Sequence, residues 1–239
     1  MPDDTSPSGT RAADLIVQQL EPKILSGELP DRSPLPAERD LMAQFGASRT
    51  VVREAITALS HRGLVEHRPR FRPIVRKPGY DTALNAIGGV VRHLLGKPGG
   101  VKNLYESRIF FERALAREAA LSARKHDIEE LRSALAANRD AMNDSDAFYE
   151  TDVAFHGVLY RIPRNPIFPA VHASYTSWLA PHWVKMARSP ERNMVNYRSH
   201  QDIFDAIVER DPDGAEESLL NHLRAAWEYV RVTFDTDPA

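Results

Sequence analysis

Three histidines and one aspartate in the second half of the chain have the residue types and spacing of metal ligands. Asp152 and His156 lie four residues apart in ETDVAFHGVL, so a helix would place them on one face, one turn apart. His200 in RSHQDIF and His222 in LLNHLRAA lie in two later segments. Apolar neighbours at helical spacing turn His222 inward: Leu219, Leu220, Leu223 and Ala226. Imidazoles and a carboxylate that converge in a core can hold a divalent metal, with zinc expected and nickel or manganese as alternatives.

Two other interpretations of these residues stay open. The chain has nine histidines, and a histidine near an apolar face is often a hydrogen-bonded core residue, because D-x-x-x-H spacing is weak evidence by itself. A metal-dependent enzyme is also conceivable, but catalytic zinc usually has three protein ligands and an open position beside a general base. Glu150 lies about 200° round the helix from Asp152. We therefore expect a binding site and not an enzyme.

The elements that would carry these residues are helices. Pro78 and Gly79 in KPGYD interrupt regular secondary structure and mark a domain boundary. No convincing strand follows them. Short connections between helical segments predict an antiparallel all-α bundle over residues 79–239. The seven predicted helices cover residues 81–96, 101–123, 127–142, 147–162, 166–183, 192–211 and 213–234.

Residues 35–65 have the pattern of a helix-turn-helix. Pro36 fits the first position of a helix, and Gly46 can take the left-handed conformation that ends it. Ser48 is a good N-cap for a second helix that runs to about Arg62. That helix would expose Arg49, Thr50 and Arg53 near its N-terminus, the part of a recognition helix that reaches base edges. The alternative is an ordinary helical hairpin with solvated arginines.

The charge distribution favours DNA. Two β-like runs, Leu64–His67 and Pro73–Arg76, flank a basic tip and predict a wing. Between Arg39 and Lys77 there are nine Lys/Arg against three Asp/Glu, in a chain whose net charge is −2. Such local positive charge is typical of phosphate contact. Because one recognition helix covers only a few base pairs, we also expect a homodimer on a near-palindromic operator of double-stranded DNA.

The phrases LPAER and SRTVVREA make residues 11–78 resemble the winged-helix domain of the GntR superfamily of bacterial transcription regulators. The resemblance implies that Arg39, Arg49, Thr50 and Arg53 contact the operator, with His67 at the wing. The chain departs from the family in two places. Its wing tip is RPRFRP, without the usual glycines, and Pro22 should kink or divide the first helix.

Residues 100–234 resemble the effector domain (FCD domain) of the FadR branch of that family. The resemblance implies one metal held by Asp152, His156, His200 and His222, with open positions for a small carboxylate effector. Arg108 in YESRIFFE would grip the carboxylate, although a salt bridge to Glu112 is an equal alternative. The phrases HLLGKPGGVKNLYESRIFFERALAREAA and SDAFYETDVAFHGVLYRIPRNPIFPAVHASYTSWL are similar to the sialic-acid-responsive repressors of this branch. They imply a repressor that answers to a sugar acid such as sialic acid; regulation by the metal itself is the alternative.

The composition of the chain indicates the cellular compartment in which it works. The chain has no cysteine, which fits a reducing compartment and excludes disulfides. Residues 1–10 are polar and rich in Pro and Ser, and we expect a disordered arm there and not a signal peptide. No apolar run approaches the roughly 18 residues that span a bilayer. The expectation is a cytoplasmic protein without a membrane partner.

Overall fold

The computed structural model describes residues 8–66, 71–183, 185 and 188–235. Its contacts divide the chain into two compact units, Met1–Ala83 and Leu84–Ala239. This division falls inside a short helix, α4 (Tyr80–Ala86), just after the Pro78–Gly79 break. Among the described residues, no helix combines the length and the apolar character that crossing a membrane requires.

The N-terminal unit contains α1 (Ser8–Ser26), α2 (Glu38–Phe45), α3 (Arg49–His61) and a two-stranded hairpin. Its core is formed by apolar side chains from all three helices and the hairpin, including Val17, Leu41, Leu59 and Val75. Pro22 lies inside α1 and does not divide it.

The turn between α2 and α3 follows from two residues that the sequence singled out. Gly46 has φ 60° at the C-cap of α2, and the Ser48 hydroxyl accepts a hydrogen bond from the Val51 N–H at the start of α3. Pro36, however, does not begin α2, whose N-cap is the extended residue Ala37. The preceding chain is held extended because the Leu35 N–H donates to Pro73 and Pro34 bridges Ile74.

The wing is an antiparallel pair of β1 (Val65–Glu66) and β2 (Ile74–Val75). Val65 lies opposite Val75 and Glu66 opposite Ile74. Each predicted β-like run thus contains a two-residue strand, whereas Leu64, Pro73 and Arg76 lie outside the strands. His67 lies outside the described residues, so its predicted DNA contact stays a prediction.

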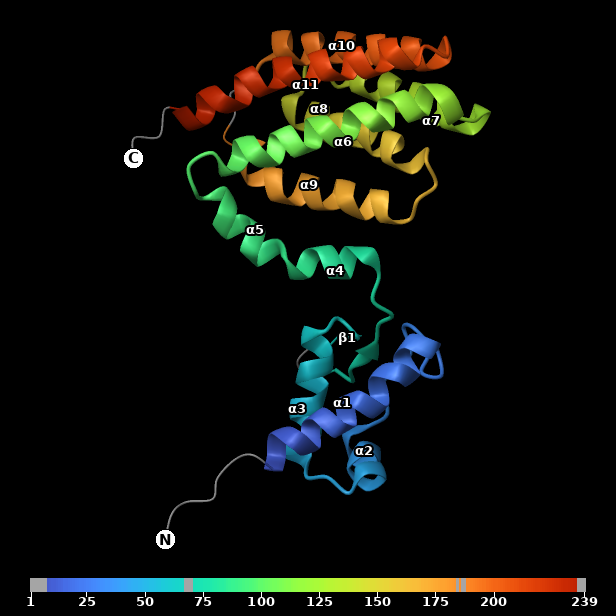
Figure 1. Ribbon diagram of the computed structural model, residues 1–239, viewed down its shortest axis with the longest axis vertical. Helices are drawn as coiled ribbons and strands as arrows, with labels where there is room; N and C mark the ends of the chain where they lie inside the picture. The colour runs from blue at the N-terminus through green and yellow to red at the C-terminus, as the bar shows by residue number, and fades with distance from the viewer. Residues whose placement is uncertain (1–7, 67–70, 184, 186–187, 236–239) are drawn as a thin grey trace. The chain divides into compact units, whose positions relative to one another are not determined.

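The C-terminal unit is helical, as expected, and Figure 1 shows its labelled elements as helices. The predicted helix 81–96 is two helices, α4 and α5 (Gly88–Leu95), which separate at Ile87. The other predicted helices agree with the structure within a few residues: α5 (Gly88–Leu95) is followed by α6 (Gly100–Ser122), α7 (Lys125–Asp140), α8 (Ser145–Arg161), α9 (Ile167–Trp183), α10 (Pro190–Val208) and α11 (Pro212–Asp235).

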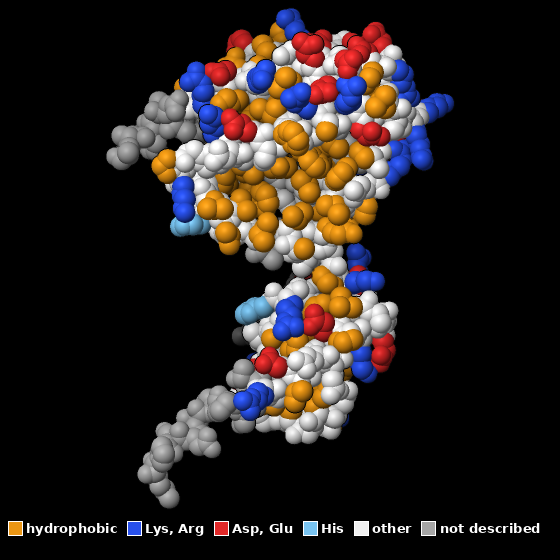
Figure 2. Space-filling model, viewed as in Figure 1, with side chains coloured by type: hydrophobic (Ala, Val, Ile, Leu, Met, Phe, Trp, Pro, Cys, Tyr) orange, Lys and Arg blue, Asp and Glu red, His pale blue; other side chains and the backbone are white. Residues whose placement is uncertain are grey.

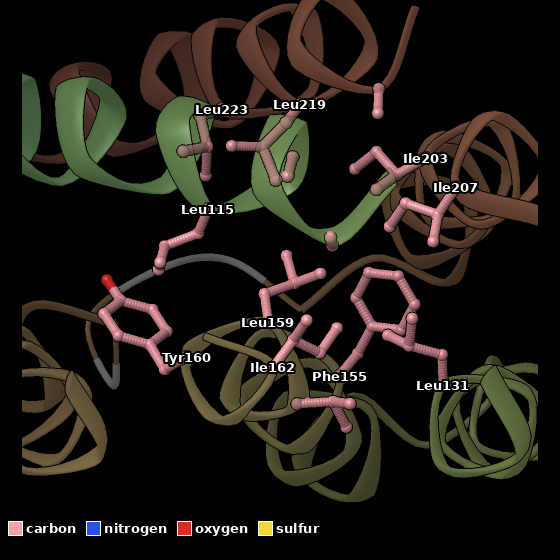
Figure 3. Close-up of a cluster of buried hydrophobic side chains, with 14 of the residues drawn as sticks. Leu115, Leu131, Phe155, Leu159, Tyr160, Ile162, Ile203, Ile207, Leu219 and Leu223 are labelled. Atoms are coloured by element: carbon pink, nitrogen blue, oxygen red, sulfur yellow. The ribbon is translucent and has the colours of Figure 1, made fainter. Parts of the chain in front are cut away.

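One apolar core fixes the helices that carry the predicted ligands. α11 packs against both α6 and α10, and α8 packs against α7, α6 and α10. Figure 3 shows Leu115, Phe155, Ile203 and Leu219 pointing toward one another from four of these helices. The buried ring of Phe155 also stacks on the ring of His200, with centroids 4.4 Å apart. Apolar packing therefore holds the histidines in place.

Candidate metal centre and DNA-binding surface

The four predicted ligands come together in the C-terminal unit. Their ligand atoms all lie within 4.8 Å of one another. The Nε2 atom of His156 is 3.2 Å from that of His222 and 3.3 Å from that of His200, and the last two are 3.2 Å apart. Asp152 Oδ1 lies 3.4 Å from His200 Nε2. Three helices (α8, α10 and α11) thus bring their donor atoms to one point.

The chemistry of this donor set fits a cation. In a neutral imidazole the Nε2 atom is either a donor or an acceptor. Among three Nε2 atoms in mutual contact, at least two must therefore both be donors or both be acceptors. That pair is repulsive, and the three histidines are buried, so water does not relieve it. Nitrogens about 2.0–2.1 Å from a tetrahedral zinc ion lie about 3.3 Å apart, close to the observed separations. A divalent ion at the centre would accept all three lone pairs.

Side chains behind the histidines orient the lone pairs inward. Glu112 Oε2 lies 2.6 Å from His156 Nδ1, so the carboxylate favours a proton on that nitrogen. His200 Nδ1 lies 3.0 Å from Asn138 Oδ1, and the Asn138 amide donates to Thr151, which fixes its orientation. In both rings the proton is then on Nδ1, and Nε2 presents its lone pair to the cluster. Such outer partners are typical of metal-ligating histidines.

Burial sets the protonation of these groups. It lowers the pKa of His200 and of His222 well below the ordinary value, and the neighbouring histidines lower both further. Both imidazoles are therefore neutral near pH 7, as metal ligands must be. Burial raises the pKa of Asp152, with partial compensation from His156 and Arg108. Burial would also raise the pKa of Glu112, but the charge of Arg108 and the hydrogen bonds from Arg108 and His156 outweigh it and keep that carboxyl ionised.

A cavity opens beside the cluster. Asp152 and His222 form part of its wall, together with Arg108, Tyr149 and Trp183. Within the described residues, the Tyr149 hydroxyl is buried without a hydrogen-bond partner. Burial raises the pKa of this hydroxyl to about 12, so it remains a donor at neutral pH. The cavity is thus lined by aromatic rings, a guanidinium and a free hydroxyl. The polar part of its wall also includes Ser145, Arg188, Ser189, Arg192, Asn193 and Asn196.

Arg108 makes the salt bridge that was one of its two predicted roles. Its Nε atom donates to Glu112 Oε1 at 2.7 Å, and both side chains are buried. The guanidinium carbon lies 5.5 Å from the ring centroid of Trp183. The two terminal nitrogens make no hydrogen bond within the described part of the chain. The salt bridge therefore orients the guanidinium and leaves its outer edge free at the cavity.

The predicted DNA contacts form an exposed group in the N-terminal unit. Arg39 on α2 and Arg49, Thr50 and Arg53 at the start of α3 are all exposed. The Nε atoms of Arg49 and Arg53 lie 3.9 and 3.7 Å from the carboxylate of Glu38. These arginine side chains are 71% and 66% exposed, so the ion pairs are weak and can yield to phosphates.

Family comparisons agree with both units. Residues 12–72 match the bacterial regulatory proteins of the gntR family, and residues 103–225 match the FCD domain. The chain belongs to the GntR family. Family members are regulatory proteins, so this GntR protein is a DNA-binding regulator and not an enzyme.

Relatives and solved structures extend this comparison. An HTH-type transcriptional repressor NanR of Cronobacter sakazakii is 39% identical over 91% of this chain and 84% of the relative. A repressor of the same name from Citrobacter rodentium is 38% identical over 90% of this chain and 84% of the relative. The structure of a Streptococcus agalactiae GntR protein matches the fold with a TM-score of 0.66 at 21% identity, over 92% of this chain and 99% of that one. The resemblance found in the sequence is confirmed.

Several residues of this GntR protein's site were not found from the sequence. Asn138 and Trp183 carry no spacing signal, because each comes from a helix whose orientation toward the cluster depends on packing. Tyr149 did carry one, since it lies three residues before Asp152 and seven before His156, which places all three on one face of α8. Glu112 was noticed only as a salt-bridge partner of Arg108. Its position one helical turn after Arg108 was the available signal, but its contact with His156 joins two helices that are distant in sequence.

Proposed function

We propose that this GntR protein is a transcriptional repressor whose affinity for its operator is controlled by a carboxylate effector bound beside a divalent metal. Asp152, His156, His200 and His222 would hold the metal. The observation that carries the proposal is the convergence of three buried Nε2 atoms beside a cavity whose wall contains Asp152, His222 and the Arg108 guanidinium. A divalent ion held by one carboxylate and three neutral imidazoles keeps net positive charge and attracts an anion.

The protein's own residues supply the rest of the effector site. Arg108 presents its two free terminal nitrogens to the cavity, and a planar fork of this kind suits a carboxylate. Tyr149 adds a neutral hydroxyl donor that has no hydrogen-bond partner among the described residues. A buried donor without a partner is costly, and a ligand oxygen would relieve that cost. The polar wall beyond these groups suits a hydroxylated acid, which supports a sugar acid such as sialic acid as the effector.

The ligands come from α8, α10 and α11, so filling the site would change how these helices pack. Only a difference in effector affinity between the DNA-competent and the released state can move the equilibrium. The DNA-reading residues of this proposal are Arg39, Arg49, Thr50 and Arg53, with His67 as a further candidate. Arg49→Ala and Arg53→Ala should each weaken operator binding.

A homodimer on a near-palindromic operator completes the proposal. The C-terminal unit exposes large apolar side chains, among them Phe110 and Leu121 on α6. Figure 2 shows hydrophobic side chains gathered on one face of this unit. Faces of this kind commonly mark protein–protein contacts. Light scattering of the full chain should give the mass of a dimer at micromolar concentration, and a monomer would contradict the proposal.

A thermal-shift screen tests the effector site. Purified protein is stripped of metal, reloaded with zinc, nickel or manganese, and melted with a panel of sugar acids and simple carboxylates. A true effector should raise the melting temperature of the metal-loaded protein by mass action, and much less that of the stripped protein. His156→Ala should abolish metal uptake, whereas His93→Ala, at an exposed histidine, should not.

The same experiment separates the alternative function of metal sensing. If metal alone releases operator DNA and no acid adds to the effect, the metal is the signal. Protein that stays metal-free after reloading yet responds normally to its acid would remove the metal from the proposal.

A further inference from the structure

The loop before β2 carries an unusually exposed aromatic side chain. Phe71 is 72% exposed, and among the large hydrophobic side chains of the described residues only Phe110, at 78%, is more exposed. Phe71 lies in a shallow groove with Pro34, Ile74 and Arg72. Burying this ring against apolar atoms of a partner would be favourable, so Phe71 is able to contribute to binding if a partner covers it.

Backbone contacts fix this loop beside the helix-turn-helix. The Arg72 Nε atom donates to the Leu35 carbonyl at 2.7 Å, and the Leu35 N–H donates to the Pro73 carbonyl at 2.8 Å. Leu35 directly precedes the turn into α2, whose first residue, Glu38, reaches Arg49 and Arg53. Phe71 is therefore held near the start of α2, where the Glu38 carboxylate faces Arg49 and Arg53 of α3.

Charge around Phe71 points to DNA as its partner. Arg72 follows it directly, and Arg76 and Lys77 directly follow β2. Arg76 pairs with Glu66, whereas Lys77 is exposed. Such basic surroundings attract phosphates, but a phenyl ring gains nothing from phosphates themselves. Its favourable contacts on a duplex are the apolar parts: deoxyribose rings and base edges, where DNA-binding proteins often place apolar side chains.

We propose that Phe71 makes an apolar contact with the sugars and base edges of operator DNA beside the site of α3. This contact would take the place of the close backbone approach that a glycine-rich tip permits. The proposal rests on the assignment of the N-terminal unit as DNA-binding. It adds an apolar contribution to affinity that is distinct from the arginine contacts.

Salt dependence distinguishes an apolar contact from an ionic one. The probe is a duplex that the wild-type protein selects from a randomised DNA pool, and operator affinity is measured by fluorescence anisotropy at several salt concentrations. Phe71→Ala should raise the Kd roughly fivefold at each concentration. The slope of log Kd against log salt should stay at the wild-type value, because no phosphate contact is lost. Phe71→Leu should recover part of the affinity.

Two control variants make the result decisive. Leu15→Ala removes another exposed apolar side chain of the same unit, on α1, and should leave the Kd unchanged. Arg49→Ala should weaken binding. A Kd for Phe71→Ala within twofold of wild type, alongside weak binding by Arg49→Ala, would overturn the role of Phe71 alone. If Arg49→Ala and Arg53→Ala also bind normally, the DNA-binding assignment fails as well. A changed salt slope for Phe71→Ala would likewise overturn the apolar contact.

Discussion

His156 depends on a carboxylate that is not itself a predicted ligand. Glu112 lies against its Nδ1 atom and also accepts hydrogen bonds from Arg108 and Tyr160. Glu112→Gln keeps the shape but removes the charge that holds the Nδ1 proton, so metal affinity should fall about 10–100-fold. Competition with a chromophoric chelator measures this. Glu106→Gln, at an exposed glutamate on the same helix, should match wild type; equal affinities for both variants would contradict the role of Glu112.

Tyr149 should act on the effector and not on the metal. Its unpartnered hydroxyl lines the cavity and stays protonated at neutral pH. Tyr149→Phe removes one hydrogen bond to the ligand, so effector affinity should drop roughly tenfold while metal affinity is unchanged. Calorimetric titration of the zinc-loaded protein with the strongest acid from the thermal-shift screen checks this. Tyr80→Phe is the control, and an unchanged effector affinity would exclude Tyr149 from the site.

The buried histidines also predict how stability depends on pH. Burial lowers the pKa of His200 and His222, and that of His172 to about 4. Between these values and about 6.5 the unfolded chain binds more protons than the folded one, so stability falls as pH falls through this window. Asp152, whose pKa is raised by burial, has the opposite sign but is a single group. Metal-free protein should therefore melt at a lower temperature at pH 5 than at pH 7, and equal temperatures would contradict these shifts.

At the scale of elements, the ends of helices could be predicted where they depend only on residues close in sequence. Gly46 and Ser48 set the turn of the helix-turn-helix as expected, because their roles depend on their own backbone and hydroxyl. Pro36 was misplaced because a distant strand residue, Ile74, holds the chain before it extended. The ligands on α8 were found by helical spacing, and the same spacing places Tyr149 on their face of the helix. The position of Asn138 depends instead on how α7 packs against its neighbours, which the sequence does not specify.

Two glycines with open surroundings should respond in opposite directions to the same substitution. Neither an added Cβ at Gly46 nor one at Gly89 would meet another atom within 4 Å, but Gly46 has φ 60° and Gly89 lies within α5. Gly46→Ala should lower the free energy of unfolding by about 1 kcal/mol, because L residues are strained there. Gly89→Ala should raise it by up to about 1 kcal/mol. Urea unfolding of the full chain measures both, and a stabilising Gly46→Ala would contradict the left-handed cap.

At the scale of the whole molecule, the helix-turn-helix and the proposed effector site lie in different compact units. No residue of the metal cluster belongs to the unit that carries Arg49 and Arg53. Control of operator binding therefore has to be a coupling free energy between two distinct sites, and not competition for one surface. Such coupling arises only if the effector binds the released state more tightly than the DNA-bound state.

Coupling between sites is reciprocal, and this gives the most demanding prediction. If the effector weakens operator affinity by some factor, saturating operator DNA must weaken effector affinity by the same factor. Operator titrations with and without the strongest acid from the screen give the first factor, and calorimetry with and without operator gives the second. In His156→Ala both factors should fall to one, because metal and effector are lost together while the N-terminal unit still binds DNA. In His93→Ala both should equal those of wild type. Unequal factors in the wild-type protein would mean that the acid acts at a second site or changes the oligomer, and a full response in His156→Ala would separate the switch from the metal cluster.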